Sequence, residues 1–173
     1  NPMEPSATLA EWSRDGDGER LVVHDAVQHG YSAQGVLAAA FGLAPERVRV
    51  VCPHTGGGFG AKGYVWPHQV LAAAAARVAG RPVRLVLSRA RMYDNVGYQP
   101  RLVQHVALGA GAGGRLTAIR HDAVNVTGVS DDFVEFATAA AKCMYASPAI
   151  HTSQRVERCN VNLPTAMRAP VEG

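Results

Sequence analysis

A glycine-rich segment carries the residues whose types and spacing are best suited to bind a ligand. It reads Thr-Gly-Gly-Gly-Phe-Gly-Ala-Lys-Gly over residues 55–63. Four glycines within five positions let successive backbone N–H groups converge on an anion, because no Cβ atom blocks the approach and positive φ angles cost little. A tight turn between a strand and a helix needs fewer glycines than this. The segment therefore predicts a loop that binds an anion or a cofactor.

The spacing within this segment excludes one nucleotide-binding loop and leaves another open. In a P-loop the lysine precedes a Ser or Thr that binds magnesium, whereas Lys62 precedes Gly63. The pattern Gly56-x-Gly58-x-x-Ala61 does match the dinucleotide fingerprint in form. The carboxylate that would bind the ribose is missing about twenty residues later, where arginines stand instead. An NADP-binding oxidoreductase domain that uses this turn is an alternative function.

Other common site chemistries have the wrong spacing here. Ser32 lies in a sequence that misses the nucleophile-elbow pattern by one residue, and it is better suited to cap a helix. Cys52 and His54 have no second pair at the spacing of a zinc site. The chain has three cysteines without C-x-x-C spacing, which argues against a disulfide scaffold or an iron–sulfur site. Buried free thiols are therefore expected at Cys52, Cys143 and Cys159.

The composition is typical of a compact α/β or α+β protein. The 173 residues are 47% hydrophobic and 18% charged, with 18 glycines and 10 prolines. The longest apolar run, residues 70–76, is far shorter than the roughly 20 residues of a membrane-spanning helix. The net charge of +3 comes from scattered arginines without a basic block, which argues against nucleic-acid binding. Because the sequence begins without a Met, we expect it to be a piece of a longer protein.

The elements that must position the glycine-rich segment alternate between strands and helices. Asp-Gly pairs at residues 15–18 predict a hairpin turn before a strand over 21–27. Helices are predicted over 32–41, with Ser32 as N-cap and Gly42 as stop, and over 65–79, with Gly80 as stop. An irregular helix is predicted over 131–148. The remaining predicted strands are 47–52, 82–88, a hairpin of 101–108 with 116–125, and 155–163.

Four motifs stand in order along the whole chain. They are Asn1-Pro2-Met3-Glu4-Pro5, Asp25-Ala26-Val27-Gln28, the run from Pro53 to Lys62, and Met167-Arg168-Ala169-Pro170. In order and spacing they resemble the molybdenum-cofactor-binding large subunit of the xanthine dehydrogenase/aldehyde oxidase family, and most of all its bacterial aldehyde or isoquinoline oxidoreductase branch. The resemblance implies an α+β fold of mixed β-sheets with packed helices, as a single partial domain over residues 1–173.

The resemblance implies a molybdenum hydroxylase. Such an enzyme hydroxylates an aldehyde or an N-heteroaromatic substrate with water as oxygen donor, and it passes electrons to iron–sulfur and FAD partner chains or to the remainder of the large subunit. The molybdenum is held by the dithiolene of molybdopterin, with the cytosine dinucleotide form among the alternatives, so no protein metal ligands are expected. A cytoplasmic location is implied, with the periplasm as the alternative.

The resemblance also assigns roles to six residues. Gln28 would hydrogen-bond an oxygen of the cofactor, and the backbone amides of Gly57, Gly58, Phe59 and Gly60 would face it. Phe59 and Arg168 are the expected catalytic residues. Phe59 would form a wall of the substrate pocket, and Arg168 would contact the cofactor, orient the substrate and stabilise developing negative charge.

At some positions the chain departs from the family pattern, and these departures change what is expected of its substrate and its activity. Gly63 stands where purine-hydroxylating members carry Glu, which favours aldehydes or N-heterocycles as substrates. The β-branched Val171 stands where the Arg-Ala-Pro corner of the family usually continues with Gly, so the local geometry there is expected to differ. The general-base Glu of the family lies outside this chain, so the chain alone is expected to be incomplete as an enzyme. A non-catalytic interaction domain derived from the family is therefore a second alternative.

Overall fold

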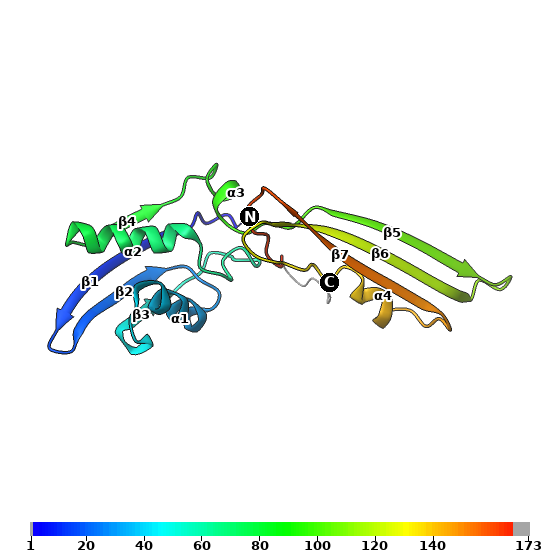
Figure 1. The fold of residues 1–173 in the computed structure, drawn as a ribbon, viewed down its shortest axis with the longest axis horizontal. Coiled ribbons are helices and arrows are strands. Elements are labelled where there is room, and N and C mark those ends of the chain that lie inside the picture. Colours follow the sequence, from blue (N-terminus) through cyan, green and yellow to red (C-terminus); the bar gives the residue numbers. More distant parts are fainter. Residues whose placement is uncertain (1, 168–173) are drawn as a thin grey trace. The chain divides into compact units, whose positions relative to one another are not determined.

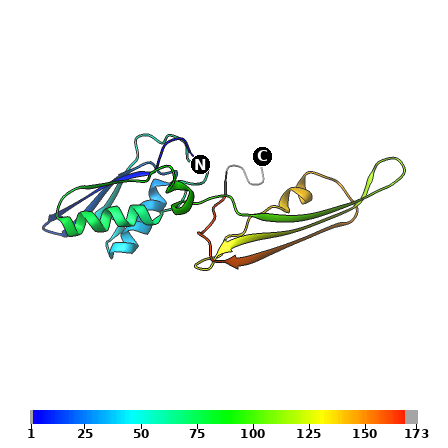
Figure 2. The same ribbon diagram turned by 90° about the horizontal axis from the view of Figure 1, so that it is seen from above.

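The computed structural model describes residues 2–167, which form two compact units (Figures 1 and 2). The first unit is Asn1–Gly97 and the second is Tyr98–Gly173. Each unit has its own β-sheet, and each sheet combines parallel with antiparallel strands. The predicted α+β class with mixed sheets is therefore confirmed. The single domain expected over 1–173 stays a prediction, because each unit is described by itself.

The sheet of the first unit starts from a hairpin. Strands β1 (Ala7–Asp15) and β2 (Gly18–Asp25) pair antiparallel, and the register joins Asp15 to Gly18. The two residues between the strands make the turn that the Asp-Gly pairs predict. Gly18 has φ of +116°, a conformation that favours glycine.

Two further strands complete this sheet in the order β3-β2-β1-β4. Strand β3 (Val48–Val51) pairs parallel with β2, and β4 (Val83–Val86) pairs antiparallel with β1. A short 3-10 helix, η1 (Pro45–Arg47), precedes β3. The predictions for 47–52 and 82–88 are thus confirmed to within a few residues.

Helix α1 (Gly30–Phe41) connects β2 to the parallel strand β3. It ends at Gly42 as predicted, because Gly42 adopts the left-handed conformation with φ of +68°. The predicted N-cap at Ser32 is wrong, since the helix begins two residues earlier with His29 as N-cap. The N–H of Ala33 donates to His29 O at 3.0 Å, so Ser32 lies inside the first turn.

Helix α2 (Pro67–Ala79) begins with Pro in its first turn and ends at Gly80, as predicted. Its small side chains allow a close approach to the sheet, and the indole N–H of Trp12 on β1 donates to Ala73 O at 2.8 Å. Both helices contribute to one core, which shows that they cover the same face of the sheet. The fully buried core residues are Ala10, Leu21, Val23, Leu37, Ala38, Val48, Ala72, Ala73 and Ala76.

The first unit closes with a short helix, α3 (Met92–Asn95), which the sequence analysis did not predict. Within residues 2–167 no helix is both long and apolar enough to span a membrane. All three cysteines are free thiols, as expected, but the expectation that they are buried is wrong: Cys143 is exposed, and Cys52 and Cys159 are partly exposed.

The second unit is a three-stranded sheet in the order β5-β6-β7. The hairpin of β5 (Leu102–Ala110) and β6 (Leu116–Gly128) is confirmed as antiparallel. Strand β7 (Ile150–Cys159) pairs parallel with β6 and begins five residues before the predicted strand. It starts early because the pairing with β6 already begins at Ile119 and Ile150.

The long helix predicted over 131–148 is wrong, since only α4 (Ala139–Cys143) forms there. Side chains from β6 hold the preceding segment in a non-helical conformation. Asn125 Nδ2 donates to Phe133 O at 2.8 Å, and the N–H of Phe133 donates to Thr127 Oγ1 at 3.1 Å. These bonds occupy backbone groups that a helix would need.

Candidate cofactor-binding loop

The glycine-rich segment lies in the loop between β3 and α2. Helix α2 begins only at Pro67, five residues after Lys62. In the dinucleotide fingerprint the glycines lead directly into a helix that returns to a parallel strand. Here the next strand, β4, does not lie beside β3: it is at the opposite edge of the sheet, separated from β3 by β2 and β1. The loop therefore lacks the strand–turn–helix geometry of the dinucleotide fingerprint.

Gln28 holds the loop from the segment that follows β2. Its Oε1 accepts the N–H groups of Gly60 at 2.8 Å and Lys62 at 3.3 Å, and its own N–H donates to Lys62 O at 2.9 Å. Because Oε1 is occupied by two donors, the amide nitrogen Nε2 is the end left for a ligand. It has no hydrogen-bond partner within residues 2–167. The predicted hydrogen bond from Gln28 to an oxygen of the cofactor stays a prediction.

The loop is strained at the residue predicted to form the pocket wall. Phe59 is the only non-glycine residue in the described part of the chain with a positive φ, +52°, and 48% of it is exposed. Gly57, two residues before it, and Gly60, directly after it, have φ angles of +86° and +92°. A Cβ on Gly57 would lie 2.8 Å from Phe59 Cε2. Strained backbone with an exposed aromatic ring is typical of ligand-binding sites.

The backbone amides of the loop divide into two groups. The N–H groups of Gly57, Gly58 and Phe59 have no acceptor within residues 2–167. The N–H of Gly60 donates to Gln28 Oε1 at 2.8 Å. The expectation that Gly60 presents its amide to a cofactor stays a prediction.

An ion pair that the sequence analysis missed joins the loop to the N-terminal segment. Glu4 Oε2 accepts the N–H of Gly56 at 2.8 Å and pairs with Lys62 Nζ. The hydrogen bond from Lys62 is the main reason why the pKa of Glu4 lies below its usual value. One signal was available, since Lys62 is one of only two lysines in a chain whose other cations are arginines.

A buried polar cluster supports the base of the loop. Asp25 Oδ2 accepts hydrogen bonds from Thr8 Oγ1 at 2.9 Å and Gln69 Nε2 at 2.8 Å. His68 is buried beside them, and its Nδ1 has no partner within the described residues. Burial lowers the pKa of His68, although the nearby Asp25 carboxylate opposes the shift. The imidazole is therefore neutral at neutral pH.

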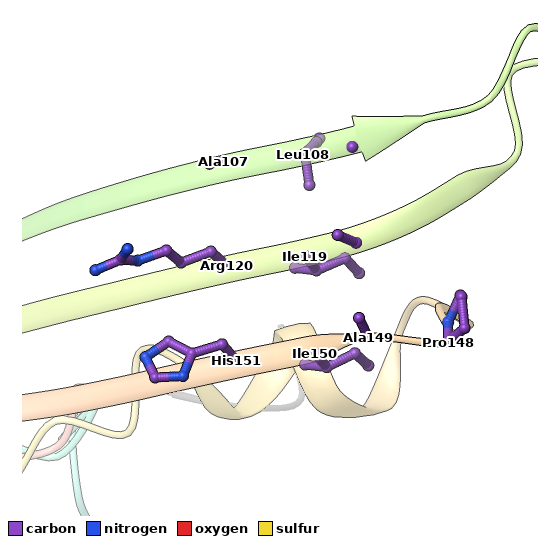
Figure 3. A pocket seen from close by; sticks show the side chains of 10 residues that line it. Ala107, Leu108, Ile119, Arg120, Pro148, Ala149, Ile150 and His151 are labelled. Atoms are coloured by element: carbon purple, nitrogen blue, oxygen red, sulfur yellow. The ribbon is translucent and has the colours of Figure 1, made fainter.

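The other predicted features fall outside this loop. Arg168 lies outside the described residues. Among residues 2–167 no group of three or more His, Cys, Asp or Glu side chains could hold a metal ion. The second unit has an open groove across β5, β6 and β7, lined in part by Leu108, Arg120 and His151 (Figure 3). None of the predicted site residues lines it.

The sequence of the chain matches a known family over nearly its whole length. Residues 1–172 match the family model described as the molybdopterin cofactor-binding domain. The aldehyde oxidoreductase molybdenum-binding subunit PaoC of Escherichia coli (strain K12) is 34% identical over 172 residues, which is 98% of this chain and 22% of the relative. The nicotine 6-hydroxylase large subunit of Paenarthrobacter nicotinovorans is 30% identical over 125 residues, which is 71% of this chain and 15% of the relative.

Solved structures share the fold. Quinoline 2-oxidoreductase from Pseudomonas putida 86 has a TM-score of 0.87 at 22% identity, covering 97% of this chain and 22% of that one. The aldehyde oxidoreductase from Desulfovibrio gigas has a TM-score of 0.81 at 25% identity, covering 98% of this chain and 19% of that one. The chain thus spans about a fifth of the length of these proteins. It belongs to the molybdopterin cofactor-binding domain family, as the resemblance of its motifs predicted.

Proposed function

We propose that Gln28 and the loop from Gly56 to Lys62 form one wall of the molybdenum-cofactor pocket in an oxidoreductase. The substrate class would be an aldehyde or an N-heteroaromatic compound, with water as oxygen donor. The names of relatives support both classes: an aldehyde oxidoreductase subunit in E. coli, an indole-3-acetaldehyde oxidase in Zea mays, and a nicotine 6-hydroxylase subunit in P. nicotinovorans.

One observation carries the proposal: the loop gathers hydrogen-bond donors that no described residue uses. They are Gln28 Nε2 and the N–H groups of Gly57, Gly58 and Phe59. Molybdopterin is rich in oxygen and carries a phosphate, so convergent N–H donors suit it. A Cβ on Gly58 would lie 2.5 Å from Gln28 Cδ, so a larger residue there would displace Gln28. The residues present therefore fit the cofactor.

Gln28, Phe59 and Arg168 have separate tasks in this proposal. When bound, the molybdenum cofactor supplies the oxygen-transfer and two-electron chemistry of the hydroxylation. Gln28 orients it by donating from Nε2, while the exposed Phe59 ring gives the substrate an apolar wall and excludes water. Arg168 would orient the substrate and stabilise negative charge. The general base would come from a Glu outside this chain.

The partners in the proposal are electron acceptors. Iron–sulfur and FAD chains would receive the electrons, and the cytosine dinucleotide form of the cofactor and a cytoplasmic location belong to the same proposal. The names of two related proteins support an assembly of several chains. They are the 6-hydroxypseudooxynicotine dehydrogenase complex subunit gamma and the nicotine 6-hydroxylase large subunit, both of P. nicotinovorans.

The first test measures molybdenum and oxidised-pterin fluorescence in the purified complete complex. Near-stoichiometric values of both support the proposal, and the absence of both from a matured complex overturns it. Quenching of NADPH fluorescence on mixing would instead support the dinucleotide alternative. Absence of the general-base Glu from the complete protein would support the non-catalytic interaction domain, which would hold neither metal nor pterin.

The second test distinguishes the role of Nε2 of Gln28, the donor, from that of Oε1, the acceptor. Gln28→Glu keeps an oxygen for the N–H groups of Gly60 and Lys62 but removes the donor at Nε2. A hydrogen bond to a charged group contributes about 1.5–3 kcal/mol, so kcat/KM should fall roughly ten- to a hundredfold. The exposed Gln99→Glu is the matched control and should behave as the wild type. An unchanged kcat/KM in Gln28→Glu would refute the role of Nε2.

A further inference from the structure

The N-terminal segment of residues 2–5 is held against the glycine-rich loop from two sides. On one side the Arg89 guanidinium donates to Pro2 O at 2.6 Å and also to Met3 O. On the other side the Glu4 carboxylate reaches the loop, and a Cβ on Gly56 would lie only 2.8 Å from Glu4 Cβ. Position 56 therefore has to be glycine for this approach.

A single oxygen of Glu4 contacts both ends of the loop. Oε2 accepts the N–H of Gly56 at 2.8 Å and pairs with Nζ of Lys62, six residues further along. The three donors without acceptors, at residues 57–59, lie between these two points in the chain. The carboxylate thus closes the segment that carries the donors.

Lys62 connects Glu4 to Gln28, through its side chain on one side and its backbone on the other. Only 4% of Lys62 is exposed, and Glu4 is the only carboxylate that forms a salt bridge with it among the described residues. A buried ammonium group without a partner is strongly disfavoured, so the ion pair fixes the side chain. The backbone of Lys62 forms two hydrogen bonds with Gln28, one in each direction.

From this geometry we propose that Glu4 and Lys62 are a pair of positioning residues, which hold the loop and Gln28 in the arrangement that binds the cofactor. The inference rests on the proposed function, because it concerns the same site. The proposed function concerns how the loop binds the cofactor. This inference adds that a residue of the N-terminal segment, Glu4, fixes the conformation of the loop. Neither side chain touches the cofactor in this proposal.

The test uses the complete complex with Glu4→Gln, Lys62→Met and the double variant. Glu4→Gln is isosteric and keeps an oxygen for the N–H of Gly56, so it removes the charge with the least disturbance. Two quantities are measured: the rate of molybdenum and pterin loss during dialysis, and hydrogen exchange of the peptide covering residues 52–66. Glu19→Gln, which breaks the exposed pair of Glu19 with Arg77, is the matched control.

We expect each single variant to lose cofactor and to exchange the loop amides roughly tenfold faster than the wild type. The double variant should be no worse than Lys62→Met, since no unpaired charge remains. Exchange in α1 should stay unchanged, which separates a local effect from unfolding. Wild-type rates for loop exchange and cofactor loss in Glu4→Gln and Lys62→Met would overturn the inference, as would strictly additive effects in the double variant.

The two proposals fail in different ways. A wild-type complex without molybdenum and pterin refutes the cofactor site and, with it, the cofactor part of the inference. In that case hydrogen exchange still measures the effect of Glu4 and Lys62 on the order of the loop. If the wild-type complex holds the cofactor and Glu4→Gln and Lys62→Met hold it equally well, only the positioning role of the pair is refuted.

Discussion

Gln28 and Gly58 fit together only because residue 58 has no side chain: a Cβ atom there would lie 2.5 Å from Cδ and 2.6 Å from Cγ of Gln28. Real Cβ atoms do not approach other atoms so closely. The Oε1 of the same amide accepts the N–H groups of Gly60 and Lys62. The shape of the loop and the orientation of the Gln28 amide are therefore set together.

Gly58→Ala should displace the Gln28 side chain and loosen the loop. Because the neighbouring atoms belong to a side chain held by two backbone donors, moving them breaks both hydrogen bonds. Molybdenum per protein, measured by elemental analysis of the purified complex, should fall well below the wild-type value. Retention of full metal content together with unchanged kcat/KM would contradict this reading of the loop.

The control for this substitution is Gly35→Ala in α1. Nothing lies within 4 Å of a Cβ at Gly35, and its φ is not positive. Alanine is favoured over glycine inside a helix by roughly 0.5–1 kcal/mol. The control should therefore keep its metal and show equal or higher stability.

Local signals in the sequence predicted the ends of elements well. Gly42 and Gly80 end α1 and α2 because each adopts the left-handed conformation that only glycine takes easily. The Asp-Gly turn likewise depends on a few adjacent residues. The N-cap of α1 was misplaced because the local preference for Ser at an N-cap selects Ser32, whereas the helix begins after His29, which makes no side-chain cap hydrogen bond.

Contacts between distant residues could not be predicted in the same way. Glu4 and Lys62 are 58 positions apart, and their pairing depends on how the whole first unit folds. The helix expected over 131–148 failed for the same reason, since Asn125 and Thr127 on β6 hold its first residues. Gln28 and Phe59 were assigned to the site only through the resemblance of whole motifs to a family.

Phe59→Gly should separate stability from function. Glycine relieves the strain at φ of +52°, about 1 kcal/mol, but it also gains freedom in the unfolded chain by a similar amount. The free energy of unfolding should therefore change by less than about 1 kcal/mol. In contrast, kcat/KM for an aldehyde or N-heteroaromatic substrate should fall because the exposed ring is gone. Wild-type kcat/KM would show that Phe59 is not part of the pocket wall.

Leu37→Ala tests the packing of α1 on the sheet. Leu37 is 1% exposed in the core of the first unit, so the substitution should destabilise this unit by about 2–5 kcal/mol. The adjacent Val36 is 49% exposed, and Val36→Ala should change stability by less than about 1 kcal/mol. Native-state hydrogen exchange of the β2 and α1 amides measures both values. Equal effects of the two substitutions would contradict the described core.

His68 should make the stability of the first unit depend on pH. Burial lowers the pKa of His68 in the folded state, whereas an unfolded His titrates near about 6.5. Below about pH 6.5 the unfolded chain binds a proton that the folded chain does not, so stability is lost as the pH falls from there towards the lower folded pKa. His68→Gln removes this term and should flatten the dependence, while the exposed His24→Gln should follow the wild type. Native-state hydrogen exchange of α2, corrected for intrinsic rates, measures the slope between pH 5 and 7.5. A wild-type slope in His68→Gln would mean that another group, and not the buried imidazole, responds to acid.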